Sequence, residues 1–485
     1  MVKRPGSGVG AVRTPSDDDV LHDECGVVAI VAPGRDVSRI TFYALHALQH
    51  RGQESAGIAV AGGGQVTVQR DMGLVSAVFD EPALRSLVGD TAIGHVRYST
   101  TGGNHWENAQ PVARPRGTGI IALGHNGNLT NTDALRERCM AAGDDLAAST
   151  DSEIIAALIA SAPGDLFEAT ASVLPDLVGA FSAVVMSETE VVAFRDPHGV
   201  RPLVLGRLGD HGHCVVSESC ALDQIGAEFI RDVRPGEVVR LSRNGIESRQ
   251  VIESVRRSMC VFEHIYFARP DTNLEGVSVW EARHRMGIEL AREAPADVDL
   301  VVGLPDSGTP AAIGFSSASG IPYAEAVVRN RYVGRSFIQP DQGLRQQGIR
   351  LKFNPLRSVI EGKRLVVVDD SIVRGNTVRQ TVQMLFDQGG AAEVHLRISS
   401  PPIAWPCFYG IDMPNRRELV AATMTLEEIV EMSGATSLAY LSLDGLERAV
   451  GRPAEGFCHA CFTGEYPIPV PSDSVKLRFE PAVAR

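Results

Sequence analysis

The sequence predicts two domains of different fold class, an α+β sandwich followed by an α/β domain with a parallel sheet. From about residue 25 to 250, short apolar runs recur between Gly-rich turns, whereas from about residue 285 compact apolar runs alternate with helical patterns. Many short strands with turn signals are typical of a sandwich, and strands alternating with helices are typical of βαβ units. The length of 485 residues agrees with two or three domains of ~150 residues each.

Composition narrows the class of protein. The chain is 44% hydrophobic and 22% charged, and its net charge is −13. An acidic chain is a poor general binder of nucleic acid or anionic membrane, so we expect neither as a partner. No apolar stretch approaches the ~18 residues of a membrane span. Eight cysteines are too few for a disulfide scaffold in so long a chain.

The first 24 residues are rich in Gly, Pro, Ser and Asp and lack the apolar core of a signal peptide. We expect them to be a flexible leader, and we expect the protein to be cytoplasmic. The predicted boundaries are a leader at 1–24, a first domain at 25–255, a second domain at 256–466 and a Pro-rich tail at 467–485.

In the first domain the pattern predicts two sheets with helices outside them. The expected strands lie at 27–31, 65–69, 120–123, 183–186, 191–194 and 200–205. The expected helices lie at 39–49 and 152–161.

In the second domain the pattern predicts buried strands at 299–303, 365–368 and 394–398, with helices after the first two. Asp369 and Asp370 follow the middle strand, in KRLVVVDDSIVRGNT, and a short loop then opens a helix capped by Asn376 or Thr377. Ligands of α/β sheets bind at the carboxyl ends of strands, and a helix N-terminus favours phosphate. The two acids can hold Mg²⁺ or accept bonds from sugar hydroxyls. The pattern favours a phosphorylated sugar, and no P-loop or dinucleotide-binding motif is present.

A second loop of the same design, Pro305-Asp306-Ser307-Gly308-Thr309, follows the strand at 299–303. Its small residues allow backbone N–H groups to approach an anion, although an ordinary turn is the alternative. The segment 329–352 between the two loops carries six basic residues and one acid. We expect a lid that closes over a polyphosphate; the alternative is a solvated basic face.

Cys25 lies directly after the leader and before an apolar strand, in DECGVVAI. If the leader were removed after Glu24, Cys25 would carry a thiol and an α-amino group of pKa ~8, so one residue would supply nucleophile and base. A cysteine in the core is the alternative.

Four further residues complete a possible amide-cleaving site. Arg97 can pair with a carboxylate, and Asp151 can bind an α-ammonium group. Asn126 and Gly127 can donate to an oxyanion. A substrate with these three features is glutamine. Each residue also has a structural alternative: a surface ion pair for Arg97, a hairpin turn for Asn126-Gly127, and a helix cap for Asp151.

Several motifs of the first domain resemble the N-terminal-nucleophile glutamine amidotransferase domain. They are CGVVAI, RGQESAGI, GHVRYST, HNGNL, STDSE and RDPHGVRPL. The resemblance implies a four-layer αββα sandwich over about 25–250. Many members read C-G-x-F-G-I where this chain reads CGVVAI, which we interpret as a substitution in the core.

The 363–377 string resembles the signature of type I phosphoribosyltransferases, which bind phosphoribosyl pyrophosphate (PRPP). The resemblance implies that Asp369 and Asp370 contact the ribose hydroxyls or Mg²⁺, with Ser307 near the metal. The implied phosphate-binding residues are Ser371, Ile372, Val373, Arg374, Gly375, Asn376 and Thr377 for the 5′-phosphate, and Asp306, Ser307, Gly308 and Thr309 for the pyrophosphate.

Together the two halves resemble the amidophosphoribosyltransferase family over about 25–470. The resemblance implies hydrolysis of glutamine at Cys25 and passage of ammonia through an internal channel to C1 of PRPP. The products would be 5-phosphoribosylamine, glutamate and pyrophosphate, in the first step of purine synthesis. It also implies inhibition by purine nucleotides and a homotetramer or dimer.

Cys458 and Cys461 form a C-x-x-C motif, and Cys260 and Cys407 lie in aromatic contexts. Four thiolates suit either Zn²⁺ or an iron–sulfur cluster, and spacing does not choose between them. A redox pair is a further alternative. The family resemblance implies a structural [4Fe–4S] cluster on Cys260, Cys407, Cys458 and Cys461.

Two other functions are alternatives. A glutaminase joined to another acceptor would need a sugar-isomerase or ATP-pyrophosphatase domain, and the VVVDDSIVRGNT loop argues against both. A PRPP-sensing regulator would have lost its catalytic residues, and Cys25, Arg97 and Asn126 are all present.

Overall fold

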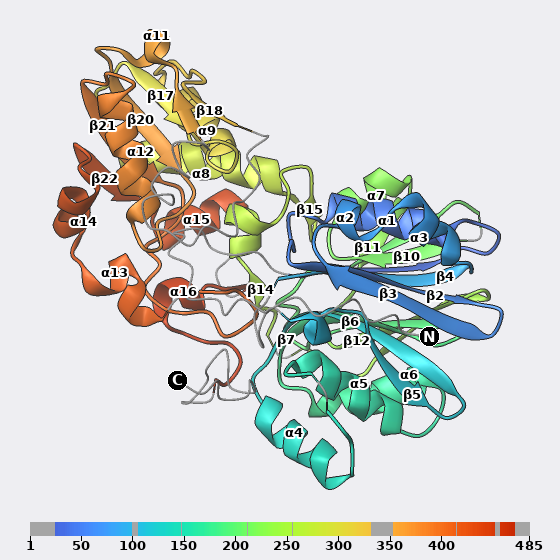
Figure 1. The fold of residues 1–485 in the computed structure, drawn as a ribbon. Helices are drawn as coiled ribbons and strands as arrows, with labels where there is room; N and C mark the ends of the chain where they lie inside the picture. Colours follow the sequence, from blue (N-terminus) through green and yellow to red (C-terminus); the bar gives the residue numbers. More distant parts are fainter. Residues whose placement is uncertain are drawn as a thin grey trace.

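The computed structural model describes residues 25–98, 105–146, 148–210, 212–254, 256–330, 353–413, 415–451 and 456–470. The predicted leader, nearly all of the predicted lid and most of the predicted tail lie outside these residues. Figure 1 shows two lobes: the first half of the chain, in blue and green, and the second half, in yellow and orange. Within the described ranges, no helix is long and apolar enough to cross a bilayer.

The first half contains two antiparallel sheets. Their orders are β11-β9-β10-β1-β4-β2-β3 and β13-β12-β8-β7-β6-β5. The strand bounds are β1 (Gly26–Val31), β2 (Ser55–Gly62), β3 (Gln65–Met72), β4 (Thr91–Arg97), β5 (Val112–Arg116), β6 (Gly119–Leu129), β7 (Gly179–Met186), β8 (Val191–Arg195), β9 (Val204–Leu208), β10 (Gly212–Val216), β11 (Glu228–Asp232), β12 (Glu237–Ser242) and β13 (Gly245–Gln250).

Strand β1 shows why this half forms four layers. Its Val27 and Ala29 belong to the core between the two sheets, whereas Val28 and Ile30 belong to the core beneath the outer helices. Because side chains alternate along a strand, a run that is apolar throughout is buried on both faces. The predicted αββα sandwich is confirmed.

Helices cover both outer faces of this sandwich. Helices α1 (Val37–Ala47) and α7 (Ser219–Ile225) contribute to the core on the seven-stranded sheet. Helices α5 (Asp151–Ser161) and α6 (Leu166–Val173) contribute to the core on the six-stranded sheet. The smaller elements of this half are α2 (Val75–Val78), α3 (Glu81–Ser86), η1 (Trp106–Asn108), α4 (Thr132–Ala141) and η2 (Leu174–Asp176).

The second half is built on a parallel sheet of order β17-β20-β21-β22. Both faces of this sheet are buried, because Val302 and Val367 belong to one core and Val301 and Val366 to another. The strand bounds are β17 (Leu300–Gly303), β20 (Arg364–Asp369), β21 (Glu393–Ile398) and β22 (Ser437–Tyr440). The helices are α8 (Val279–Glu293), α9 (Thr309–Ser319), α11 (Arg357–Ile360), α12 (Asn376–Asp387), α13 (Val420–Thr423), α14 (Leu426–Ser433) and α15 (Leu443–Val450), with the 3-10 turn η4 (Arg416–Glu418). A separate strand pair is formed by β18 (Val327–Arg329) and β19 (Phe353–Pro355). The predicted parallel-sheet domain is confirmed.

A short segment joins the halves. Strand β14 (Met259–Cys260) lies between the two lobes in Figure 1 and pairs in parallel with β23 (Phe457–Cys458), which precedes α16 (Ala460–Thr463). After β14 come the π-helix η3 (Glu263–Phe267), β15 (Asn273–Leu274) and β16 (Val277–Ser278). Ala180 and Val200 of the first half share one core with the second half, so the lobes are packed together.

Two local predictions were wrong. Residues 200–203 are not in a strand, since β9 begins at Val204. Helix α12 is not capped by Asn376 or Thr377: its N-cap is Gly375, and Asn376 is the first helical residue. Gly375 has a φ of 85°, which a glycine adopts without the steric cost that other residues incur.

Candidate active site

Cys25 precedes β1 and is 6% exposed. Its thiol donates a hydrogen bond to the carbonyl oxygen of Tyr98 across 3.4 Å. Burial raises the pKa of the Cys25 thiol to about 11, although the positive charge of Arg97 opposes that effect. At neutral pH the thiol is therefore protonated, and a nucleophilic role requires a base that removes this proton.

Arg97 and Asp151 both lie close enough to Cys25 to act on its thiol electrostatically. Arg97 ends β4 and is 2% exposed, so it is not the surface ion pair of the alternative interpretation. The carboxylate of Glu54 lies 3.8 Å from the Arg97 guanidinium. Glu54 is a buried acid that sequence reasoning missed, although it lies inside the RGQESAGI motif.

Asp151 is the first residue of α5, and Thr150 is the N-cap, so the cap interpretation of Asp151 was wrong. Its carboxylate accepts a hydrogen bond from the Leu129 N–H at 2.9 Å and lies 3.5 Å from Nδ1 of His125. Burial opposes ionisation, but His125 and the backbone donors outweigh it and hold the pKa of Asp151 below its ordinary value. The site therefore contains a buried carboxylate that is ionised at neutral pH.

Asn126 and Gly127 lie inside strand β6, opposite Ser182 and Phe181, and do not form the hairpin turn that their pairing suggests. Gly127 has a φ of 137°, and a Cβ there would lie 2.0 Å from the carbonyl oxygen of Ala180. Only glycine therefore permits this backbone, which turns the chain locally within a paired strand.

The Asn126 side chain is fully buried, and neither of its amide atoms has a hydrogen-bond partner among the described residues. Leaving a buried polar group unpaired costs about 1–3 kcal/mol. Such a group is expected where a ligand supplies the missing partner.

The second candidate site lies at the carboxyl ends of β17 and β20, which pair in parallel. The loop after β17 contains Ser307, and the loop after β20 contains Asp370 and Ser371. Both serine hydroxyls donate to the Asp370 carboxylate across 2.5 Å. The two predicted loops therefore meet at one edge of the sheet.

Glycine allows the two loops to meet closely. A Cβ on Gly308 would lie 2.4 Å from the carbonyl oxygen of Val368, the residue before the acidic pair. Helices α9 and α12 begin at Thr309 and Asn376, directly after the two loops. Their N-termini are consequently available to phosphate groups at this edge.

The pKa of Asp369 is raised well above its ordinary value by burial and by repulsion from Asp370. The pKa of Asp370 is also raised by burial, although Ser307 and Ser371 oppose the rise. Two adjacent carboxyl groups in this state gain from a bound cation, which stabilises both charges.

The remaining predicted phosphate contacts differ in kind. Ile372 and Val373 bury their side chains in hydrophobic cores, so they can offer a phosphate only backbone groups. Arg374 donates to Glu418 at 3.1 Å, and Arg329 donates to Asp306 at 2.7 Å. The predicted lid from residue 331 onward lies outside the described residues.

The four cysteines of interest gather where the two lobes meet. Cys260 pairs with Cys458 in the register of β14 and β23, and the N–H groups of residues 404 and 405 both bond to the Cys461 carbonyl. Cys260, Cys458 and Cys461 belong to one core, and Cys407 packs against it. Burial and mutual repulsion raise the pKa of the Cys461 thiol. Yet no group of three such side chains in the described ranges is arranged as ligands of one metal ion.

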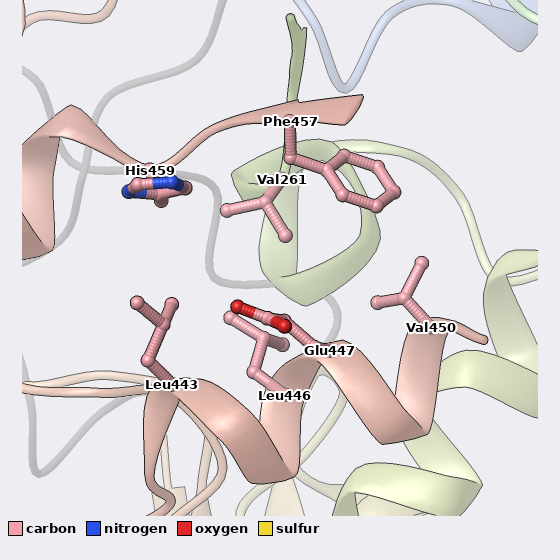
Figure 2. A pocket seen from close by; sticks show the side chains of 7 residues that line it. All are labelled: Val261, Leu443, Leu446, Glu447, Val450, Phe457 and His459. Carbon is pink, nitrogen blue, oxygen red and sulfur yellow. The ribbon is translucent and has the colours of Figure 1, made fainter. Parts of the chain in front are cut away.

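A small cavity lies beside this region. Figure 2 shows Val261, Leu446, Glu447, Phe457 and His459 among the residues that line it. Its volume of about 10 Å³ is near the minimum that holds one water molecule. None of its lining residues belongs to the predicted sites, and no substrate fits in it.

Comparisons with known proteins agree with this geometry. A family model described as a glutamine amidotransferase domain matches residues 95–224. An amidophosphoribosyltransferase of Mycobacterium tuberculosis is 52% identical over 466 residues, which cover 93% of this chain and 88% of that protein. The chain belongs to the amidophosphoribosyltransferase family. An amidophosphoribosyltransferase of Synechococcus elongatus is 51% identical over 94% of this chain and 93% of that protein.

Solved structures of this family share the fold. A PRPP amidotransferase from Bacillus subtilis, complexed with ADP and GMP, has a TM-score of 0.88 and 45% identity over 93% of this chain and 99% of its own. A structure described as the allosteric regulatory enzyme of purine biosynthesis has a TM-score of 0.89 at 45% identity, over 95% of this chain and 99% of its own. This amidophosphoribosyltransferase is thus a glutamine-dependent transferase of purine biosynthesis that acts on PRPP. The interpretations as another synthase or a sensor are not supported.

Proposed function

We propose that glutamine is hydrolysed at Cys25 and that the ammonia passes through the molecule to a PRPP site at Asp369–Asp370. The observation that supports this division most directly is the buried amide of Asn126, which finds no partner within the described part of the chain and lies in the half that holds Cys25, Arg97 and Asp151. The paired loops at Ser307 and Asp370 lie in the other half.

The glutaminase half needs a base, because burial keeps the Cys25 thiol protonated. Removal of the leader after Glu24 would give Cys25 an α-amino group of pKa ~8 that takes the thiol proton. The thiolate then attacks the side-chain amide carbon of glutamine, while Arg97 holds the α-carboxylate and Asp151 the α-ammonium group.

The attack moves charge onto the amide oxygen of glutamine. The Asn126 side-chain amide and the Gly127 N–H donate to this oxyanion. Collapse of the intermediate breaks the C–N bond and releases ammonia, which carries away the proton held by the α-amino group. Water then hydrolyses the thioester, and glutamate leaves.

In the second half, ammonia attacks C1 of PRPP, and the C1–O bond to pyrophosphate breaks. Residues 371–377 would bind the 5′-phosphate, and residues 306–309 the pyrophosphate. Asp369, Asp370 and Ser307 offer the oxygen atoms that Mg²⁺ prefers, and the raised pKa values of the two aspartates fit a site completed by a cation. When bound, Mg²⁺ would neutralise charge that develops on the leaving pyrophosphate.

We propose a [4Fe–4S] cluster on Cys260, Cys407, Cys458 and Cys461. Cys260, Cys458 and Cys461 share one core where the two lobes meet, and Cys407 packs against it. Ligation by four thiolates suits an iron–sulfur cluster. Burial raises the pKa values of the Cys260, Cys458 and Cys461 thiols, which is consistent with a cationic centre that stabilises the thiolates. The cluster would hold the β23–α16 segment against β14.

Purine nucleotides are proposed inhibitors, supported by the ADP and GMP complex of the Bacillus subtilis relative. A homotetramer is the proposed assembly.

Glutamine with a labelled amide nitrogen tests the internal passage of ammonia. In the presence of excess unlabelled ammonium at mildly acidic pH, the product should carry the label. Dilution of the label to the solution value would contradict internal passage.

A further inference from the structure

The carbonyl oxygen of Cys25 is held by a buried arginine. Arg51 donates from Nε to this oxygen across 3.0 Å, and Arg51 is 1% exposed. Its other two nitrogens face Glu263, with distances of 3.0 Å from Nη1 and 2.8 Å from Nη2. Nη1 also donates to Glu218 across 2.5 Å. The guanidinium is thus fixed on both of its edges.

This carbonyl has unusual importance for an N-terminal nucleophile. Once a leader is removed, no preceding peptide holds Cys25, although its Cα carries both the thiol and the α-amino group. The remaining backbone anchors of Cys25 are its own carbonyl and the strand that follows. The position of the Arg51 guanidinium therefore sets where sulfur and amine lie relative to Asn126 and Gly127.

The two carboxylates that hold Arg51 come from different parts of the chain. Glu218 is the N-cap residue of α7 in the sandwich. Glu263 is the first residue of the π-helix η3, whose Ile265 and Phe267 pack in the core of the second half. The second half thus supplies a direct partner of the arginine that contacts the nucleophile.

Glu263 is presented on a rigid segment. Arg283 of α8, which is 3% exposed, donates to the carbonyls of His264 and Ala268 across 2.9 and 2.8 Å. It therefore spans η3 and ties it to α8. Arg201 lies 3.8 Å from the Glu263 carboxylate, and both side chains are fully buried. Single-turn π-helices are frequent at functional sites.

We propose that Glu263 is a positioning residue for glutamine hydrolysis, acting through Arg51 on the backbone of Cys25. This proposal rests on the proposed role of Cys25 as nucleophile. Under this proposal, glutamine hydrolysis in the first half of the chain depends on a residue that the second half supplies. A bidentate arginine–carboxylate pair is strongly directional, because both carboxylate oxygens accept from the guanidinium. If one of these acceptors is lost or withdrawn, the guanidinium can turn away from Cys25.

The test compares Glu263→Gln with a matched control, Glu237→Gln. Glu237 is also buried and forms a bidentate pair, with Arg231 at 2.7 and 2.8 Å, within the sandwich. We expect Glu263→Gln to lower kcat with glutamine about 10- to 100-fold, because small displacements of reacting groups cost that much. The KM for glutamine and the ammonia-dependent turnover should remain those of the parent, and Glu237→Gln should change neither activity.

Two further readouts separate positioning from simple destabilisation. The rate at which iodoacetamide alkylates Cys25, followed by peptide mass, should fall in Glu263→Gln and stay unchanged in Glu237→Gln, even if both variants lose the same thermal stability. Arg51→Lys should lower the rate by a similar factor, and the double variant should be no worse than either single one, since both act through one contact. Glu263→Asp replaces Glu263→Gln if the latter does not fold. It should show the same selective loss, because its side chain is one methylene shorter and withdraws the carboxylate from Arg51 while keeping the charge.

The proposal is overturned if Glu263→Gln matches Glu237→Gln in glutamine turnover and in the rate of Cys25 alkylation. It is also overturned if Glu263→Gln lowers the turnover with glutamine and the turnover with ammonia by the same factor. The Cys25→Ala variant distinguishes this failure from that of the proposed function. Glutamine-dependent activity in Cys25→Ala would refute Cys25 as nucleophile, whereas its absence together with an unaffected Glu263→Gln would refute the role of Glu263 alone.

Discussion

The Ser307 hydroxyl donates a hydrogen bond to the Asp370 carboxylate across 2.5 Å, and this bond joins two loops that lie 63 residues apart in the sequence. Because Ser307 follows β17 and Asp370 follows β20, the bond places both loops at one edge of the parallel sheet. A substrate with two phosphate groups on one sugar can therefore contact both loops at once.

Asp370→Asn should lower the turnover with glutamine and with ammonia alike, because both nitrogen sources react at the PRPP site. We expect a loss of at least about 100-fold, since removing one stabilising group from a transition state commonly costs that much. Asp299→Asn is the control: Asp299 precedes β17 at the other end of the sheet and pairs with Arg364 at the surface. Ammonia-dependent activity that survives in Asp370→Asn would remove Asp370 from the site.

Cys25→Ala should abolish glutamine-dependent synthesis and leave ammonia-dependent synthesis intact. The reason is that Cys25 and Asp370 lie in different halves, and only the first is required to cleave an amide. Measurement of pyrophosphate release with each nitrogen source tests this prediction. If a folded Cys25→Ala protein loses both activities, the two sites are not separate.

Asn126→Ala should lower kcat for glutamine hydrolysis about 10²- to 10³-fold, the usual cost of one oxyanion donor. The free enzyme should lose little stability, because the buried amide has no partner among the described residues. Asn131→Ala is a suitable control, since its side chain bonds the backbone of Asp176 and Val178 instead. Unchanged kcat in Asn126→Ala would exclude this amide from the oxyanion site.

The pH dependence of Cys25 alkylation should depend on the leader. With the leader retained, burial raises the pKa of the thiol to about 11, so its reaction with iodoacetamide should increase only as the pH approaches that value. In a chain that begins at Cys25, the α-amino group takes the proton, and turnover of glutamine should rise with an apparent pKa of ~8. Equal pH profiles for the leader-bearing chain and the chain that begins at Cys25 would contradict the α-amino mechanism. Full activity of a chain that mass spectrometry shows to retain the leader would also contradict it.

Cys458→Ser should reduce bound iron and sulfide and lower the thermal stability, because β23 would lose its covalent link to β14. The Cys458→Ser protein, purified anaerobically, is compared with a Cys214→Ser control. Cys214 is a buried cysteine of the sandwich core, and the control should keep its iron. A parent protein that binds zinc, or neither metal, would contradict the proposed cluster.

Much of the fold could be predicted because its signals are local. The apolar runs of β1 and β20 are continuous, and the loops after β17 and β20 combine small residues with acids at strand ends. Such patterns report burial and helix starts directly. Short motifs likewise located Cys25, Arg97 and Asp151, which the structure brings together.

Other features depend on contacts between distant segments and could not be predicted. Asn126-Gly127 has the composition of a hairpin turn, but pairing with Ser182 and Phe181 of β7 keeps it inside β6. The contact between Arg51 and Glu263 spans 212 residues, and no local pattern marks either residue as a partner of the other. Glu54 and Glu218 were missed for the same reason, since buried acids become visible only once their partners are placed.

The most direct test of the coupled reaction is the release of glutamate from glutamine by anaerobically purified protein, with and without PRPP and Mg²⁺. If Cys25 and Asp370 serve one reaction, glutamate release should rise strongly with PRPP, and pyrophosphate should appear in equal amount. Glutamate release that is indifferent to PRPP, without pyrophosphate, would contradict the coupling of the two sites.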